Sequence, residues 1–98
     1  MTYTRMAICE VLSDEHVPEI VSKMQEHART LPYVIGHSIL VEQGGRLVIL
    51  ITEWRNLQDC FLYHSGRAYR QLIADTQVML AGSVVVKFFQ NKTERSSV

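Results

Sequence analysis

The sequence carries no excess charge of either sign, because ten lysine and arginine residues balance ten aspartate and glutamate residues. Surfaces that bind nucleic acids or anionic membranes need a basic excess, so this balance argues against both partners. Long hydrophobic runs are also missing. The longest purely aliphatic run is LVILI at residues 47–51, whereas a helix that spans a bilayer needs about 20 apolar residues. No membrane segment is therefore predicted.

Cysteine and metal-ligand patterns are scarce as well. The two cysteines, Cys9 and Cys60, have no CxxC spacing, and the four histidines form neither an HxH nor an HExxH pattern. A disulfide scaffold and a zinc site are not expected, and two free thiols in a reducing cytosol are predicted instead. The sequence QGG is typical of a turn, and no glycine-rich phosphate loop occurs. We expect neither a metal nor a cofactor.

The amino-terminal stretch MTYTRMAICEVLSDEH has acidic residues where the apolar part of a secretion signal would end. We therefore expect a soluble, cytoplasmic protein. Of the 98 residues, 47% are hydrophobic and 20% are charged, a composition that predicts a globular chain. A single domain is expected over residues 1–92, followed by a polar tail over residues 93–98.

The order of periodic segments predicts the fold. Residues 4–12 alternate as a strand, with Met6, Ile8 and Leu12 on one face and Ala7, Cys9 and Val11 on the other. Residues 13–31 have helical spacing; Ser13 or Asp14 can cap this helix, and Pro18 is tolerated near its start. Residues 33–42 and 46–54 form a hairpin around QGG.

Residues 57–64 follow Asn56, a good N-cap, and predict a second helix that Ser65 and Gly66 break or kink. A further helical stretch is expected to run on to Gly82, with Leu80 on its buried face. The segment SVVVKFFQ is then the last strand. This β-α-β-β-α-β order predicts a ferredoxin-like α+β fold, in which two helices cover one face of an antiparallel four-stranded sheet.

The sheet face that the helices leave open is also predicted to be apolar. In LVILI both faces are aliphatic, and the last strand has valine and phenylalanine on both sides. A monomer would expose a larger apolar patch than soluble monomers normally carry. We therefore expect a homodimer that packs sheet against sheet, although an unknown second protein could also cover this face.

One stretch carries a family resemblance. A strand that ends in Glu-Trp, followed by His-Ser ten residues beyond the Trp, lies in VILITEWRNLQDCFLYHSGRAYRQL at residues 48–72. The chain from Thr4 to Gln90 thereby resembles the antibiotic biosynthesis monooxygenase-like family of dimeric α+β barrels. The resemblance implies a cofactor-independent oxygenase of small electron-rich phenols, quinols or anthrones, or a haem-degrading enzyme. The first strand lacks the Asn of haem-degrading relatives, which argues against haem degradation. A non-catalytic binding or structural homodimer is the alternative.

The candidate catalytic residues are Trp54 and His64, which we expect to border one pocket. Trp54 is either an apolar plug at the rim of the sheet or a flat wall for an aromatic ring. His64 is either a core histidine or a base that takes a phenolic proton. The candidate substrate-binding residues, which could also be structural, are His37, Phe61, Arg67, Tyr69 and Arg70.

An arginine near the pocket could stabilise a phenolate or peroxide anion. Arg67 and Arg70 follow the helix break and are the candidates, although most surface arginines only solvate a helix. Gly36 and Ser38 leave space on their own face of the strand that carries His37. The other two histidines, His16 and His27, are predicted to be solvated.

Overall fold

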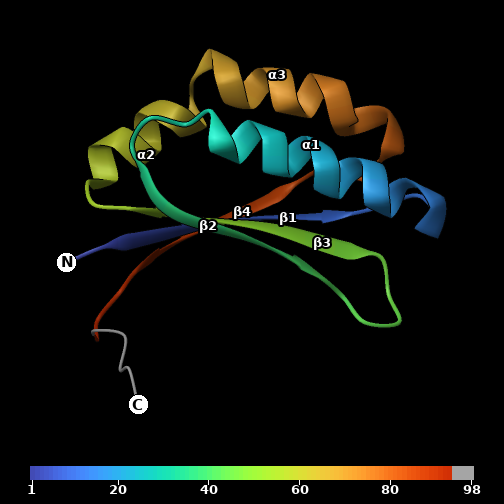
Figure 1. The fold of residues 1–98 in the computed structure, drawn as a ribbon, viewed down its shortest axis with the longest axis horizontal. Coiled ribbons are helices and arrows are strands. Elements are labelled where there is room, and N and C mark those ends of the chain that lie inside the picture. The colour runs from blue at the N-terminus through green and yellow to red at the C-terminus, as the bar shows by residue number, and fades with distance from the viewer. Residues whose placement is uncertain (94–98) are drawn as a thin grey trace.

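The computed structural model describes residues 1–93; the predicted polar tail, except for Thr93, lies outside the described residues. Four strands form one antiparallel sheet in the order β2-β3-β1-β4. Their bounds are Tyr3–Glu10 for β1, Val34–Val41 for β2, Leu47–Trp54 for β3 and Val85–Gln90 for β4. The helices of the described residues lie together on one side of this sheet (Figure 1). The predicted ferredoxin-like α+β fold is confirmed.

Helix α1 spans Val17–Arg29, and a short 3-10 turn, η1 at Asp14–His16, precedes it. Pro18 lies in the first turn of α1, where its missing N–H costs no helical hydrogen bond. The predicted cap was wrong. Because the 3-10 turn intervenes, His16 occupies the N-cap position, and neither it nor Ser13 makes a side-chain capping bond.

Helices α2, Leu57–His64, and α3, Arg67–Thr76, are separated at Ser65 and Gly66 as the sequence predicted. The Asn56 side chain caps α2 by accepting a hydrogen bond of 2.8 Å from the backbone N–H of Gln58. A Cβ atom at Gly66 would lie 2.9 Å from the carbonyl oxygen of Leu62, so only glycine fits at this close turn.

The expectation that the last helix continues to Gly82 was wrong. Helix α3 ends at Thr76, and a 3-10 turn, η2 at Gln77–Met79, follows it. Leu80 then forms an isolated β-bridge with Val11. This pairing takes Leu80 out of the helix, because the same backbone groups cannot serve an α-helix and a bridge to the end of β1.

The register of the sheet places alternate residues of each strand under the helices. Arg5 lies opposite Thr52 on one side and Phe88 on the other, and Ala7 lies opposite Leu50 and Val86. The main core is built from this inner face and from α1 and α3, and its buried members are Ala7, Cys9, Val11, Ile20, Met24, Ala28, Val48, Leu50, Leu72 and Met79. A second cluster joins Trp54, Cys60 and Tyr63 at one end of the sheet. Both cysteines are buried and free.

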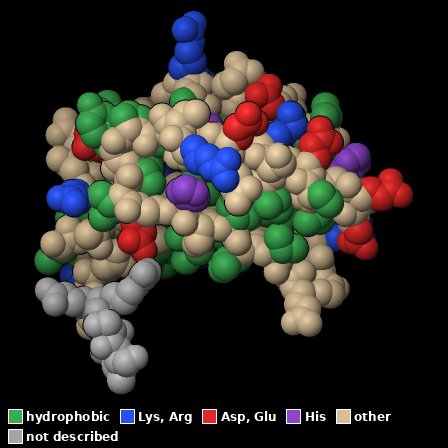
Figure 2. All heavy atoms as spheres, in the orientation of Figure 1, with side chains coloured by type: hydrophobic (Ala, Val, Ile, Leu, Met, Phe, Trp, Pro, Cys, Tyr) green, Lys and Arg blue, Asp and Glu red, His purple; other side chains and the backbone are tan. Residues whose placement is uncertain are grey.

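The outer sheet face carries an apolar row, as the sequence predicted. One row across the four strands consists of Leu40, Ile49, Ile8 and Val85, which pair in register. Leu40 and Val85 are both 51% exposed, at the two ends of this row. In the orientation of Figure 1, with the sheet below the helices, hydrophobic side chains follow the lower side of the molecule (Figure 2).

No helix within residues 1–93 combines the length and the hydropathy that crossing a bilayer requires.

Candidate functional site

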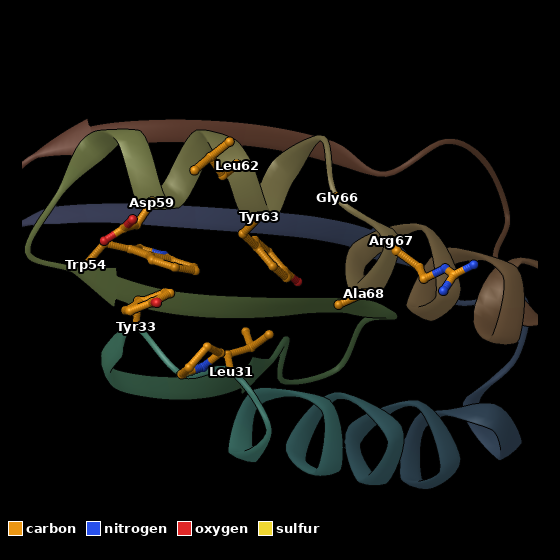
Figure 3. A pocket seen from close by; sticks show the side chains of 10 residues that line it. Leu31, Tyr33, Trp54, Asp59, Leu62, Tyr63, Gly66, Arg67 and Ala68 are labelled. Atoms are coloured by element: carbon orange, nitrogen blue, oxygen red, sulfur yellow. The ribbon is translucent and has the colours of Figure 1, made fainter.

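A cavity of about 280 Å³ opens between the end of β3, the loop after α1 and the junction of α2 with α3. We call it the Trp54 pocket. Its lining consists of Leu31, Pro32, Tyr33, Trp54, Asp59, Leu62, Tyr63, Gly66, Arg67 and Ala68. The side chains of Leu31, Tyr33, Trp54 and Tyr63 face one another across it (Figure 3). The walls are mostly apolar and aromatic, as in pockets that bind small organic ligands.

Trp54 forms a fixed wall of this pocket. It ends β3, is 2% exposed, and its indole Nε1–H donates a 2.9 Å hydrogen bond to Oγ1 of Thr52. Its ring centroid lies 5.4 Å from that of Tyr63 at a tilt of 33°. Because the polar N–H is satisfied within the protein, the ring can contact a ligand through its apolar surface alone.

The most unusual side chain near the pocket is Arg5, which sequence reasoning missed. Arg5 lies on the inner face of β1 and has no exposed surface. Its guanidinium carbon lies 4.9 Å from the ring centroid of Tyr63 and 4.2 Å from that of Tyr69. Arg5 thus brings a full positive charge into a cage of aromatic rings.

The hydrogen bonds of Arg5 are incomplete. Its Nη2 donates to Nδ1 of His64 at 3.1 Å, whereas Nε and Nη1 are buried and have no partner within the described residues. A buried donor without an acceptor costs about 1–3 kcal/mol, and an aromatic face that attracts the charge supplies no lone pair for these N–H groups. Such a site is electrostatically prepared for an anion.

His64 lies beside Arg5 and is absent from the lining of the Trp54 pocket. Trp54 and His64 therefore do not border one pocket in this arrangement, contrary to the expectation. Burial, and then the charge of Arg5, lower the pKa of His64 below its ordinary value. When Nδ1 accepts from Arg5 and the ring is neutral, the remaining proton is on Nε2, so His64 offers no free lone pair.

A second histidine lies closer to the pocket wall. Nε2 of His27 and the hydroxyl of Tyr63 form a 2.6 Å hydrogen bond. His27 is half-buried, so the expectation that it is solvated was wrong. Burial, and then the charge of Arg5, lower the pKa of His27. Burial dominates at Tyr63 and raises its pKa to about 12, so its hydroxyl keeps its proton at neutral pH.

Tyr69 and Phe61 lie on the other side of this cluster. Tyr69 is half-buried and stacks on His64, with ring centroids 5.5 Å apart. Phe61 is 48% exposed and meets Phe88 edge-on at 5.2 Å. Neither residue lines the Trp54 pocket. Tyr69 contacts Arg5 and His64 directly, whereas Phe61 is connected to His64 only through Phe88.

The two surface arginines differ. Arg67 lines the Trp54 pocket, but it is exposed and its side chain extends away from the aromatic walls (Figure 3). Arg70 is exposed on α3 and lines none of the described pockets. Arg5, in contrast, lies directly over the ring of one wall residue, Tyr63.

His37 is exposed on the edge strand β2. A surface hollow beside it is lined by Ile35, Gly36, His37, Ser38, Ile51 and Glu53, so the space predicted next to Gly36 and Ser38 exists. This hollow is separate from the Trp54 pocket, because the two share no lining residue.

The sequence did contain one signal for Arg5. Strand alternation places Arg5 on the same face as Ala7 and Cys9, which is the buried face. No such signal pointed to the contact between His27 and Tyr63, which are 36 residues apart. Within residues 1–93, no group of three or more His, Cys, Asp and Glu side chains is placed to hold a metal ion.

The sequence matches no protein-family model and no curated protein. Solved structures are similar in fold. A protein from Mycobacterium tuberculosis, Rv0793, has a TM-score of 0.77 at 13% identity, with 98% of this chain and 100% of that chain covered. An antibiotic biosynthesis monooxygenase has a TM-score of 0.74 at 13% identity, covering 93% of this chain and 99% of that one.

A third structure is that of SnoaB, a cofactor-independent oxygenase from Streptomyces nogalater, solved as a mutant. Its TM-score is 0.75 at 9% identity, and 95% of each chain is covered. At such identities the likeness concerns the backbone and not the site residues. The chain therefore has the fold of the antibiotic biosynthesis monooxygenase-like proteins, as the resemblance in its sequence predicted.

Proposed function

We propose that this protein is a cofactor-independent monooxygenase of a small electron-rich aromatic compound of the phenol, quinol or anthrone type. The observation that carries the proposal is the pairing of an apolar pocket, walled by Trp54 and Tyr63, with the buried cation of Arg5 beside it. The fold shared with SnoaB, a cofactor-independent oxygenase, gives further support. At about 280 Å³ the pocket lies near the lower end of the volumes of small-molecule sites.

In the proposed reaction the substrate supplies the electrons itself. The aromatic ring stacks on Trp54 and loses a proton, and the resulting anion is stabilised by the charge of Arg5. The anion passes one electron to O₂, and the radical pair recombines to a peroxide. For an anthrone, the ring carbon keeps one oxygen atom as a carbonyl and the other leaves as water, so anthrone and O₂ give anthraquinone and water.

Two histidines are candidates for the base. His64 follows from the sequence, but its Nδ1 must first lose the hydrogen bond from Arg5 before it can take a proton. His27 is connected to the pocket through Tyr63: the Tyr63 oxygen can accept the substrate proton while its own proton passes to His27. This hydrogen bond favours His27, and the loss of a general base typically lowers the rate by about 10²–10⁴.

We also propose that the protein is a homodimer joined through the outer sheet face. The row Leu40, Ile49, Ile8 and Val85 leaves an apolar surface that the helices do not cover. A two-fold pair of sheets buries the same row on both partners, which is the self-complementary contact of a symmetric dimer.

A non-catalytic protein that binds a small aromatic ligand is the second candidate. The position of His64 outside the pocket lining favours it, because the predicted base and the predicted wall do not meet in one space. In this case Arg5 holds the ligand and no turnover follows.

The two candidates differ in O₂ consumption. We expect the wild-type protein to consume O₂ with at least one member of a panel of hydroquinones and anthrones. The variants His27→Ala, His64→Ala and Trp54→Phe are compared at equal concentration, with Arg55→Gln as a control, since Arg55 is exposed and absent from the pocket lining. The histidine whose loss lowers the rate about 10²-fold or more is the base.

Equal rates in wild type and both histidine variants would remove both histidines from the chemistry. No uptake with any member of the panel would favour the non-catalytic candidate.

A further inference from the structure

The unpaired charge of Arg5 is a feature that the folded chain does not itself explain. The side chain has no exposed surface, and its Nε and Nη1 have no hydrogen-bond partner within residues 1–93. Nothing in the described chain accepts from these two nitrogens. A buried charge in a protein is normally paired. A ligand could therefore supply the acceptor that the chain does not.

The groups that contact Arg5 are aromatic or weakly polar. Tyr63 and Tyr69 present ring faces to the guanidinium, and His64 offers one lone pair to Nη2. None of these side chains is an aspartate or a glutamate, so no carboxylate neutralises the charge. The acceptor that completes the site therefore has to bring negative charge with it.

The register of the sheet places Arg5 next to the Trp54 pocket. Arg5 lies opposite Thr52, and Tyr3 lies opposite Trp54, so Arg5 and Trp54 are diagonal neighbours on the inner face. Such positions lie about 7–8 Å apart, within reach of aromatic and long side chains. Tyr63 contacts both places, since it lines the pocket and its ring lies over the guanidinium.

We propose that the Trp54 pocket binds an aromatic carboxylate, with the ring on Trp54 and the carboxylate on the free N–H groups of Arg5, reached by rotation of Tyr63. A carboxylate only accepts hydrogen bonds, and it forms charge-assisted bonds with guanidinium N–H groups. The proposal names the ligand class of the pocket, and it rests on the proposed function only in using the same pocket.

Calorimetry with two matched, non-oxidisable probes tests this assignment. The probes are 2-naphthoate and 2-naphthamide, which have the same rings and differ in the charge of one group. We expect the wild-type protein to bind the naphthoate about tenfold to a hundredfold more tightly, the range for hydrogen bonds to charged groups. Arg5→Met is expected to abolish this preference, because methionine fills a similar space without charge.

Two further arginine variants locate the effect. Arg67→Met removes the exposed arginine of the pocket lining, and Arg55→Met removes an exposed arginine outside it. Both are expected to keep the preference for naphthoate. A measurement on the wild-type protein needs no variant: the ¹H–¹⁵N signal of Arg5 Nε, protected by burial, should shift with naphthoate and much less with naphthamide.

Several results would overturn the assignment: no binding of naphthoate, equal affinity for both probes, or a preference that survives in Arg5→Met. A preference lost in Arg67→Met and kept in Arg5→Met would move the anion to the surface arginine. Because the probes are bound and not oxidised, these outcomes are independent of the O₂ assay. An inactive protein with the Arg5-dependent preference leaves this site intact and refutes only the oxygenase.

Discussion

Replacing Arg5 by methionine should stabilise the folded protein, although it removes contacts with two tyrosine rings and a hydrogen bond to His64. In the wild-type protein the guanidinium is fully buried, and its Nε and Nη1 have no acceptor among residues 1–93. Methionine is unbranched and apolar, and it fits irregular space in a core. The substitution therefore removes a desolvated charge without opening a large cavity.

The magnitude follows from the contacts. Each unmade buried hydrogen bond costs about 1–3 kcal/mol, and Arg5 has such groups on two nitrogens. The interactions lost are two contacts with tyrosine rings, worth about 0.5–2 kcal/mol each, and one hydrogen bond to His64. Replacing buried charges by apolar residues is often neutral or stabilising by about 1–4 kcal/mol. We expect a gain of at least about 1 kcal/mol, which raises Tm by about 4–8 °C in a domain of this size.

The assay is urea and thermal unfolding followed by near-ultraviolet circular dichroism, which reports on Trp54 and the tyrosines around it. Protomer concentration is held fixed, because association of subunits shifts the apparent stability. Arg55→Met is the control, since an exposed arginine should change stability by less than about 0.5 kcal/mol. A loss of 1 kcal/mol or more in Arg5→Met would refute the reasoning and make Arg5 a structural residue.

Three other predictions concern pH, assembly and haem. The pKa values of His27 and His64 are lowered in the folded state from 6.5, so the unfolded chain takes up protons first as pH falls. The free energy of unfolding should be greatest above about pH 7 and should decline through pH 6.5 and below. The decline should be less steep in His27→Gln. Urea midpoints that rise on acidification would contradict this prediction. Sedimentation at micromolar concentration should give about twice the 11.3 kDa chain mass. Ile49→Lys should reduce this mass to that of one chain, whereas Ala74→Lys, at an exposed position of α3, should not. A wild-type monomer would refute the dimer. Hemin with a reductant should keep its Soret band apart from non-enzymatic bleaching, and rapid loss that depends on His64 would show haem degradation.

Much of the architecture follows from short-range patterns. The alternation in β1, the hairpin of β2 and β3, and the cap at Asn56 depend on neighbours within a few residues, and each is confirmed in the structure. The end of helix α3 was predicted wrongly. Leu80 forms a bridge with Val11, which is far away in the chain, and so lies outside the helix. The periodicity of the residues around Leu80 gives no information about this distant pairing.

The candidate site depends much more on tertiary structure. Trp54 lines the pocket at the end of β3, and its role as a wall for a ligand ring stays a prediction. The partner expected for it, His64, faces Arg5, and the histidine joined to the pocket wall is His27. Those pairings connect α1, α2 and β1, and no spacing along the chain encodes them.

By itself, the sequence determined which faces of the sheet are apolar, because side chains alternate across a strand with a period of two residues. Only the tertiary structure decided which charges meet in the interior. The packing of α2 and α3 over β1 encloses Arg5 between Tyr63 and Tyr69, and no described residue is an acidic partner at Nε or Nη1. Burial is a collective property of all the elements around a residue, so a lone arginine in a strand becomes a buried, incompletely bonded charge only when the helices cover it.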